Sequence, residues 1–421
     1  MSKIQWLLSR LRKKLWIRVS LFAVFGVVVA IMASLVGRLF PGMIPFDVSS
    51  DAIDSLLSII ASSMLAVTTF SVGALTAAYS SATSHGTARA TQLLTQDRVV
   101  QNSLATFVGS FLFSIVGLIA LKVSAYGPEG RAVLFVVTLG IIALIVLALL
   151  QWINQLTRLG RVSDTIGRIE QETRDAFDAR LKLPFLGGAP LPETAIDSGP
   201  GTEVVTPTVG YLCFIDTAHL SDLAEEAGCR IDILVLPGTF AFADKVLARV
   251  TGPKEVSDDL ISEVRSAFTI DTMRSFDQDP RFGLVVLTEV ALRALSPAVN
   301  DPGTGIDVIG RHTRLLSFWA DAWENACTQA PQYPRLRVPA LTYDDLFEDA
   351  FSLIARDGAG QIDVMLRLAK SLVALGRIGP EASRQAARAQ LQLALDRARD
   401  ALPVEQDRQR LTAAVAKASQ P

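Results

Sequence analysis

The sequence predicts a membrane α-helical bundle of four transmembrane helices, followed by a cytoplasmic α+β domain with a small sheet and a helical C-terminal part. Half of the 421 residues are hydrophobic and only 19% are charged, against roughly 25% in soluble domains. The charges are also uneven, because segment 17–153 holds very few of them. This division excludes a purely soluble protein. The three scattered cysteines (Cys213, Cys229 and Cys327) exclude a disulfide-rich secreted scaffold.

The segment 17–153 contains four apolar runs long enough to cross a hydrocarbon core, which takes roughly 20 residues. None has an acidic residue in its interior. The first is too long for a signal peptide and lacks a small-residue cleavage pattern. The four predicted transmembrane helices cover 17–40, 55–79, 103–124 and 132–153.

The basic residues predict the orientation of these helices. Segment 1–16 is basic and has no acidic residue, whereas the 41–54 loop has three aspartates and no Lys or Arg. Arginines also follow the second and fourth runs. By the positive-inside rule, both termini are therefore cytoplasmic, and the protein is a multi-pass protein of the bacterial inner (plasma) membrane. Segment 1–16 either lies on anionic lipid as an amphipathic helix or only enforces this topology.

Small and hydroxyl-bearing side chains recur at spacings of three and four in the second run, which places them on one helical face. One interpretation is close helix packing, and the other is a pore lined by several copies of this helix. A similar face in the third run contains Ser103, Thr106, Ser110, Ser114 and Gly117, whereas the fourth run is largely Leu, Ile and Val. The second-run face comprises Ser58, Ser62, Ala66, Thr69, Gly73, Thr76 and Ser80.

No ionisable residue lies in the middle of any predicted span, and no Pro-broken helix marks a substrate site at the midplane. Proton pumps and coupled transporters commonly need such features. A passive channel does not need them, so that class remains compatible with the sequence.

The segment after residue 160 has 28 basic and 37 acidic residues, a net charge of −9. This acidic balance argues against binding of nucleic acid. We predict a helical exit and a Pro/Gly-rich linker over 154–207, an α+β domain over 208–330, and a helical region over 331–421. Strands are expected at 210–216, 231–236 and 245–250, and helices at 219–227, 262–268, 283–295, 305–326, 343–356, 361–375, 380–401 and 404–418.

The turn between the helices at 283–295 and 305–326 contains two prolines and a capping aspartate. Pro297 ends one helix, and Asp301 caps the next with Pro302 in its first turn. Free N–H groups at such a helix start also bind anions, so Ser296, Asn300 and Thr304 belong to a candidate ligand or structural turn. A similar capping turn occupies 277–281.

Several of these strings resemble a bacterial family of predicted membrane proteins, domain of unknown function 2254. The similar strings are 79–117, Gly210-Tyr-Leu-Cys-Phe-Ile-Asp216, Pro237-Gly-Thr-Phe240, Asp279-Pro280 and 291–304 around Ser296-Pro-Ala-Val-Asn-Asp-Pro302. The resemblance covers about residues 15–330, and Ser84-His85-Gly86 departs from the Ser-Pro-Arg-like turn expected there. It implies the architecture above and carries no established activity.

We find no catalytic motif in the sequence. The three histidines (His85, His219 and His312) share no metal-ligand spacing with cysteines or carboxylates. No phosphate loop, nucleophile elbow or dinucleotide fingerprint is present. The sequence therefore predicts no enzyme, no metal and no cofactor.

Two hypotheses for function follow. The first is a homo-oligomeric channel in the lipid bilayer, assembled or gated by its cytoplasmic domain, with Ser62, Thr69 and Thr76 facing a shared axis. The second is a non-conducting membrane-anchored sensor or scaffold, whose cytoplasmic domain binds a protein or a small anion.

Overall fold

The structure is a computed structural model. It describes residues 17, 19–21, 24–29, 31–32, 49–85, 87, 89–90, 97–123, 127–157, 161–195, 200–252 and 256–420. The chain forms two compact units, each of which we describe by itself. The membrane unit contains the described residues within 7–84 and 91–164, and the C-terminal unit those within 85–90 and 165–421.

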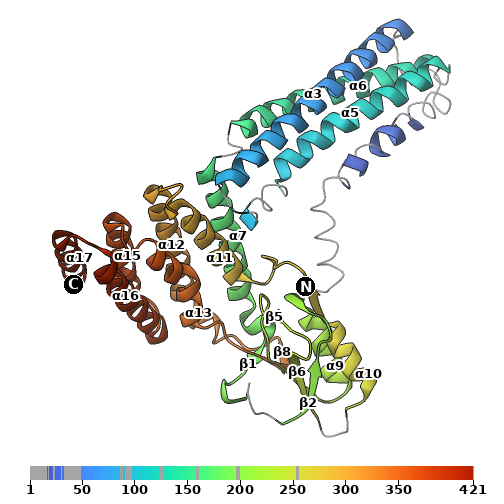
Figure 1. Cartoon of the computed structure of the whole chain (residues 1–421). Coiled ribbons are helices and arrows are strands. Elements are labelled where there is room, and N and C mark those ends of the chain that lie inside the picture. The colour runs from blue at the N-terminus through green and yellow to red at the C-terminus, as the bar shows by residue number, and fades with distance from the viewer. Residues whose placement is uncertain are drawn as a thin grey trace. The chain divides into compact units, whose positions relative to one another are not determined.

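Three long helices form the membrane unit: α3 (Ser50–His85), α5 (Arg98–Lys122) and α6 (Pro128–Leu156). They lie side by side in Figure 1. Each contains a segment long and apolar enough to cross a membrane, namely Ser50–Ser80, Val99–Lys122 and Gly130–Leu156. Three of the predicted spans therefore correspond to candidate membrane-spanning helices. Half of the predicted span 17–40 lies outside the described residues, and its described residues are helical. Segment 1–16 lies wholly outside them.

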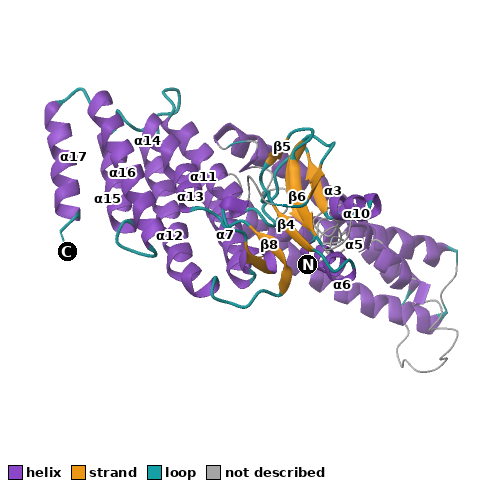
Figure 2. Cartoon of the chain, turned by 90° about the horizontal axis from the view of Figure 1, so that it is seen from below, coloured by secondary structure: helices purple, strands orange, loops and turns teal. Residues whose placement is uncertain are grey.

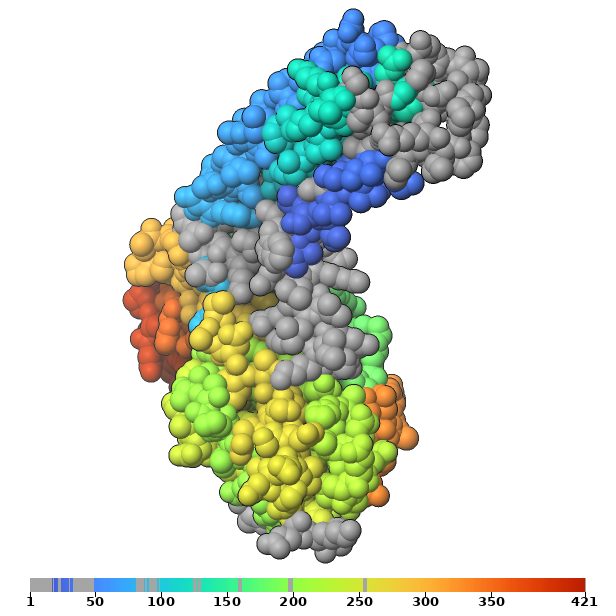
Figure 3. Space-filling view, turned by 90° about the vertical axis from the view of Figure 1, so that its right-hand side faces the viewer, coloured from blue at the N-terminus to red at the C-terminus, as the bar shows by residue number. Residues whose placement is uncertain are grey.

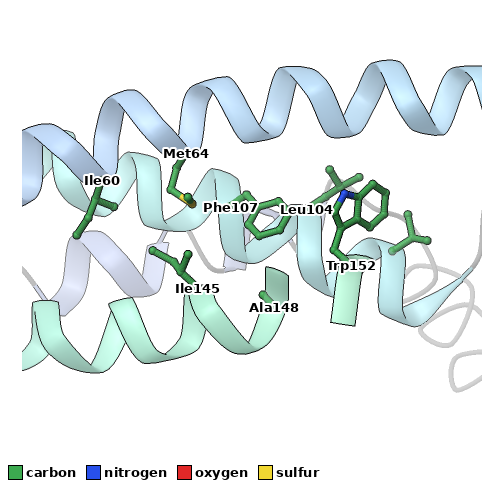
Figure 4. Close-up of a cluster of buried hydrophobic side chains, with 8 residues drawn as sticks. Ile60, Met64, Leu104, Phe107, Ile145, Ala148 and Trp152 are labelled. Carbon is green, nitrogen blue, oxygen red and sulfur yellow. The ribbon is translucent and has the colours of Figure 1, made fainter. Parts of the chain in front are cut away.

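Side chains from all three helices fill the core of the membrane unit (Figure 4). In the larger cluster, Met64 of α3 and Phe107 of α5 lie near Ile145 of α6, and Trp152 closes one end. A second cluster joins Leu57, Phe113 and Leu134. The outward residues of α6 include Leu139, Leu147, Leu150 and Ile153, all about half exposed or more, as expected for a helix that faces lipid tails.

Two small sheets lie in the C-terminal unit. The five-stranded sheet has the order β1 (Gly188–Pro190), β8 (Tyr333–Val338), β4 (Arg230–Ile233), β6 (Val246–Thr251) and β2 (Thr202–Val205). Strand β8 pairs in parallel with β1 and β4, and β6 pairs antiparallel with β4 and β2. The second sheet has the order β5 (Phe240–Ala241), β3 (Gly210–Ile215) and β7 (Phe268–Asp271), all antiparallel.

Helices surround these sheets. Helix α9 (Thr217–Glu226) follows β3, and α10 (Asp258–Ser266) precedes β7. In Figure 3 the residues between about 200 and 280, coloured green to yellow, form one continuous surface.

Helix α7 (Val162–Lys182) packs on α11 (Pro280–Leu295) and α12 (Pro302–Ala326). The rings of Phe177 and Trp319 lie 5.1 Å apart, and a Cβ on Gly283 would lie 2.7 Å from Thr173 Cβ.

The remaining helices form a layered array beside α12 in Figure 2. They are α13 (Tyr343–Phe347), the π-helical turn η2 (Glu348–Ser352), α14 (Leu353–Asp357), α15 (Ile362–Leu375), α16 (Glu381–Ala401) and α17 (Glu405–Ala418). The predicted helices from 283 to 418 are thus present, although η2 interrupts the one predicted at 343–356.

The structure contains five strands that were not predicted from the sequence, namely β1, β2, β5, β7 and β8. The predicted helix 262–268 is wrong at its end, because α10 ends at Ser266 and Phe268 begins β7. Strands β1 and β2 lie in the segment expected to be a linker, and β8 lies in the region expected to be helical. Strands from three predicted segments therefore share the five-stranded sheet.

Candidate functional site

The hydroxyl face of the second span is an exposed stripe on α3, which we call the α3 stripe. All seven of its residues, from Ser58 to Ser80, are exposed. At about 100° per residue, the stripe lies nearly opposite the buried side of the helix, where Ile53, Leu57 and Met64 are at most 4% exposed. Helix α3 therefore packs through its apolar side and presents its small side outward.

Three hydroxyls of the α3 stripe donate to carbonyls of their own helix. Ser62 Oγ donates to Ser58 O at 2.9 Å, Thr69 Oγ1 to Leu65 O at 3.0 Å, and Thr76 Oγ1 to Val72 O at 2.9 Å. The proton of each of these three hydroxyls is thus satisfied, while each oxygen keeps acceptor capacity on the outer surface. At these three positions the stripe can pack against another helix without an unsatisfied donor, or present oxygen atoms to water or cations.

The similar face of α5 is placed differently. Ser103, Thr106, Ser110 and Ser114 are at most 5% exposed, and Ser103 Oγ donates to Ala148 O of α6 at 3.5 Å. A Cβ on Gly117 would lie 3.0 Å from Leu57 Cδ1, whereas one on Gly73 of the α3 stripe would meet nothing within 4 Å. Packing among the described residues of the membrane unit therefore explains the α5 face and does not explain the α3 stripe.

A buried polar pair at the start of α5 was not predicted from the sequence. Asp97 caps α5 by accepting hydrogen bonds from Val99 N at 2.7 Å and Val100 N at 3.2 Å. Its second oxygen accepts from Gln155 Nε2 of α6 at 2.6 Å. The cap signal of an aspartate before an apolar run was readable, but its partner 58 residues away was not. This pair fixes the start of α5 to the end of α6.

The candidate turn of Ser296, Pro297, Asn300, Asp301, Pro302 and Thr304 connects α11 to α12. Asp301 caps α12: its carboxylate accepts from Thr304 N at 3.1 Å and from Thr304 Oγ1 at 2.6 Å, and the hydrogen bond from that hydroxyl lowers the pKa of Asp301. Ser296 Oγ donates to Arg293 O at 2.6 Å, and Asn300 has a φ of 51°. The Asp301 carboxylate thus occupies the helix start that an anion would use.

The turn at 277–281 is built around a buried aspartate. Asp279 is 1% exposed, caps α11 through Phe282 N at 3.1 Å, and accepts from Arg274 Nε at 2.9 Å. Burial raises the pKa of Asp279, and Arg274 opposes this by favouring the carboxylate. Burial lowers the pKa of the nearby Arg180 to about 10. Gln278 extends the site by exchanging two hydrogen bonds with the backbone of Ile215.

These contacts give the polar turns a structural role. Arg180 of α7 donates to Gln278 O at 2.9 Å, so the network joins α7, β3 and α11. Glu289 pairs with Arg89, and Asp307 pairs with Arg311; the carboxylates near the α11–α12 turn therefore have separate partners.

Among the described residues, no group of three His, Cys, Asp or Glu side chains is arranged to hold a metal ion. Cys213 is buried, and its Sγ donates to Met273 O at 3.0 Å.

The candidate spans and the two sheets define the class of protein. It is a mostly helical membrane protein with three candidate spans and a sheet-containing C-terminal region. The family model described as "Predicted membrane protein (DUF2254)" matches residues 12–374. The chain therefore belongs to this family. The match extends beyond the expected residue 330 and includes β8 and nearly all of α15.

The chain is also similar to mycobacterial proteins. It is 29% identical over 162 residues to an uncharacterized protein of Mycobacterium tuberculosis and to one of Mycobacterium bovis. Each match covers 37% of this chain and 29% of the relative, so the chain spans less than a third of the length of the curated relatives it matches. No solved structure matches this chain.

Proposed function

We propose that this protein is an oligomeric channel of the bacterial inner membrane, in which copies of α3 surround a shared axis. The proposal includes four transmembrane helices, two cytoplasmic termini and a cytoplasmic C-terminal unit that assembles or gates the pore. It includes no catalytic activity. The exposure of the α3 stripe is the observation that supports it.

The side chains of the α3 stripe favour contact with something other than lipid tails. Lipid tails are matched by branched apolar side chains, which α6 presents at Leu147 and Leu150. The α3 stripe instead presents hydroxyls and Gly73, between exposed Ile59 and Phe70 on one side and Leu65 on the other. Membrane helices associate through small residues, and a stripe this wide suits several copies around an axis.

The hydroxyl oxygens suit a weakly polar pore lining. Because Ser62, Thr69 and Thr76 donate to their own helix, they turn lone pairs outward. Rings of oxygen atoms replace part of the hydration shell of a cation. The proposed conducted species is therefore a small cation or a neutral polar solute.

Cysteine cross-linking in native membranes tests the assembly. Thr69→Cys and Ser62→Cys are expected to form disulfide-linked dimers under mild oxidation, whereas Leu147→Cys on the outer face of α6 is not. All three are made with Cys327 replaced by Ser, since Cys213 and Cys229 are buried. Equal cross-linking at all three positions would show random collision and would contradict the shared axis.

The same variants separate a wet pore from dry packing. A membrane-impermeant thiosulfonate reagent is expected to modify Thr69→Cys within the oligomer and to block ion flux into proteoliposomes. Cross-linking without modification or flux would place the stripe in a dry interface and would refute the channel.

The second candidate function is a membrane-anchored sensor or scaffold that binds a cytoplasmic protein or a small anion. A donor-lined cavity in the C-terminal unit favours its anion-binding form. Asp301 already occupies the start of α12. The proposed anion site is therefore this cavity and not the 296–304 turn.

A further inference from the structure

A cavity of about 300 Å³ opens between the two sheets of the C-terminal unit. Its walls come from the segment after β2, from β6, from the end of α10 and from β7. The volume is at the lower end of the range for small-ligand sites. Six residues that line it are Thr206, Thr208, Leu247, Arg265, Thr269 and Ile270.

Two polar residues that line this cavity, Arg265 and Thr269, have donor groups without a partner in the described part of the chain. Arg265 Nε donates to Val205 O at 2.7 Å, which orients the guanidinium plane and leaves its two terminal nitrogens for another partner. Among the described residues, Arg265 has no ion pair with a carboxylate. Thr269 Oγ1 is buried and has no hydrogen-bond partner in the described part of the chain. Arg265 and Thr269 both line the cavity, and a guanidinium together with a hydroxyl is a donor set that binds oxyanions.

The backbone fixes the geometry of this cavity. Thr206 is 2% exposed, its N donates to Lys245 O at 3.1 Å, and its O accepts from Asp244 N at 2.9 Å. Its hydroxyl accepts from Thr208 N at 3.0 Å. The part of the wall that contains Thr206 is thus held at both its backbone and its side chain. A cavity with such a fixed wall is suited to binding a ligand with little rearrangement.

An exposed apolar patch adjoins the cavity. Segment 206–211 lies beside segment 240–245. The backbone of Thr206 is hydrogen-bonded to Asp244 and Lys245, and Gly210 of β3 pairs with Ala241 of β5. On this surface Phe242 is 67% exposed and Val209 is 54% exposed. Exposed Lys245 adds a positive charge and Asp244 a negative one. Aromatic side chains beside a cationic oxyanion site are typical of surfaces that contact lipid headgroups.

We propose that this cavity binds a phosphate-type oxyanion through Arg265 and Thr269. Two sources present the same chemistry: the headgroup phosphate of an anionic phospholipid, and a soluble phosphate. The inference does not depend on the proposed channel, because it concerns only residues of the C-terminal unit.

Thermal unfolding of the full chain in phosphatidylcholine nanodiscs tests binding of the soluble anion. Inorganic phosphate, against chloride at equal ionic strength, is expected to raise the Tm by about 2–4 °C once it exceeds its Kd roughly tenfold. Arg265→Gln and Thr269→Val are expected to lose this rise. Arg335→Gln is the matched control, since Arg335 also donates to one backbone carbonyl (Cys229 O, 3.4 Å) and lies outside the cavity.

A fluorescent label tests the lipid source. Phe242→Cys, in a Cys327→Ser background, is labelled with an environment-sensitive dye and compared in nanodiscs with and without about one third phosphatidylglycerol. A blue shift with phosphatidylglycerol that Arg265→Gln abolishes assigns the site to a lipid headgroup. A phosphate-dependent Tm rise without this shift assigns it to a soluble phosphate. If folded wild-type protein shows neither effect, or if Arg265→Gln retains both, the proposal is overturned.

Discussion

The hydroxyl of Thr288 lies 3.0 Å from Nε2 of His312 and donates to Asp349 O at 2.7 Å. Because Thr288 has one proton to donate, His312 Nε2 carries the hydrogen of the shared bond, and Nδ1 is unprotonated. His312 is fully buried, and Nδ1 has no hydrogen-bond partner in the described part of the chain. Asp349 belongs to the π-helical turn η2, whose i→i+5 hydrogen bonds differ from those of an α-helix. The pair therefore joins α11, α12 and η2.

We predict that the C-terminal unit loses stability as pH falls below 6.5. Burial lowers the pKa of His312 from 6.5 to about 3. Between these values the unfolded chain binds a proton that the folded chain does not, so the free energy of unfolding decreases with falling pH. At pH 5 this site alone is expected to cost about 2 kcal/mol relative to pH 7. Urea unfolding of wild type and His312→Gln at pH 5 and pH 7 measures this cost. The difference between their free energies of unfolding should change by that amount between the two pH values, and an unchanged difference would disprove the prediction.

Replacing Thr288 by Val should destabilise the C-terminal unit by about 2–3 kcal/mol. The exchange keeps the shape but leaves the N–H of His312 without a partner in a buried site. Thr313→Val is the control, because Thr313 Oγ1 donates only to Ile309 O of its own helix. Its expected loss is below about 1 kcal/mol. Denaturant unfolding gives both values, and equal losses would mean that the Thr288 network contributes nothing.

Gly238 has a position that only glycine fits. Its φ is 98°, and a Cβ there would lie 2.7 Å from Asp279 Cγ. Gly238→Ala should therefore cost about 3 kcal/mol or more, because it adds backbone strain and disturbs a buried ion pair. Gly228→Ala is the matched control: its φ is 61°, and a Cβ there meets nothing within 4 Å, so about 1 kcal/mol is expected. A similar Tm for the two variants would contradict the steric argument.

Much of the fold was readable because its signals are local. Long apolar runs gave three candidate spans, and the Asp-Pro pairs at 279–280 and 301–302 gave the starts of α11 and α12. The missed strands lack such signals: β1 has three residues and β2 has four. Strand β8 contains Pro334 and two arginines, and it is a strand because it pairs with β1 and β4 on both sides. Those partners are more than 100 residues away.

The candidate sites were predictable only in part for the same reason. Three- and four-residue spacing places Ser62, Thr69 and Gly73 on one face of α3, but it does not say which face turns inward. The stripes of α3 and α5 look alike in sequence, and only the packing shows that one is exposed and the other buried. The Arg265 cavity and the pair of Thr288 with His312 each join residues from separate elements. No spacing rule reports such pairs.

We predict that both termini lie in the cytoplasm, and reporter fusions test this. A fluorescent protein that folds only in the cytoplasm should fluoresce at either terminus, and alkaline phosphatase inserted after Ser49 should be active. The physical reason is the basic charge of 1–16 and of the residues after α6, which stay on the cytoplasmic side. An even number of spans is required for this result. Fluorescence at only one terminus would show an odd number and would refute the four-span topology.

Gly73 and Gly140 provide a matched test of the α3 stripe. A Cβ at either position meets nothing within 4 Å, so leucine at either should leave the Tm of the membrane unit unchanged. Gly73 lies in the stripe, whereas Gly140 lies on the outer face of α6. A leucine at 73 would hold neighbouring helices apart, because close approach needs small residues.

In nanodiscs, Gly73→Leu should therefore shift the mass distribution from oligomer to single chains, while Gly140→Leu keeps the wild-type distribution. The converse result, with oligomers lost only in Gly140→Leu, would move the interface to α6 and remove the basis for a pore around α3. If both variants keep the wild-type distribution, the stripe faces lipid. The exposed hydroxyls would then contribute nothing to assembly.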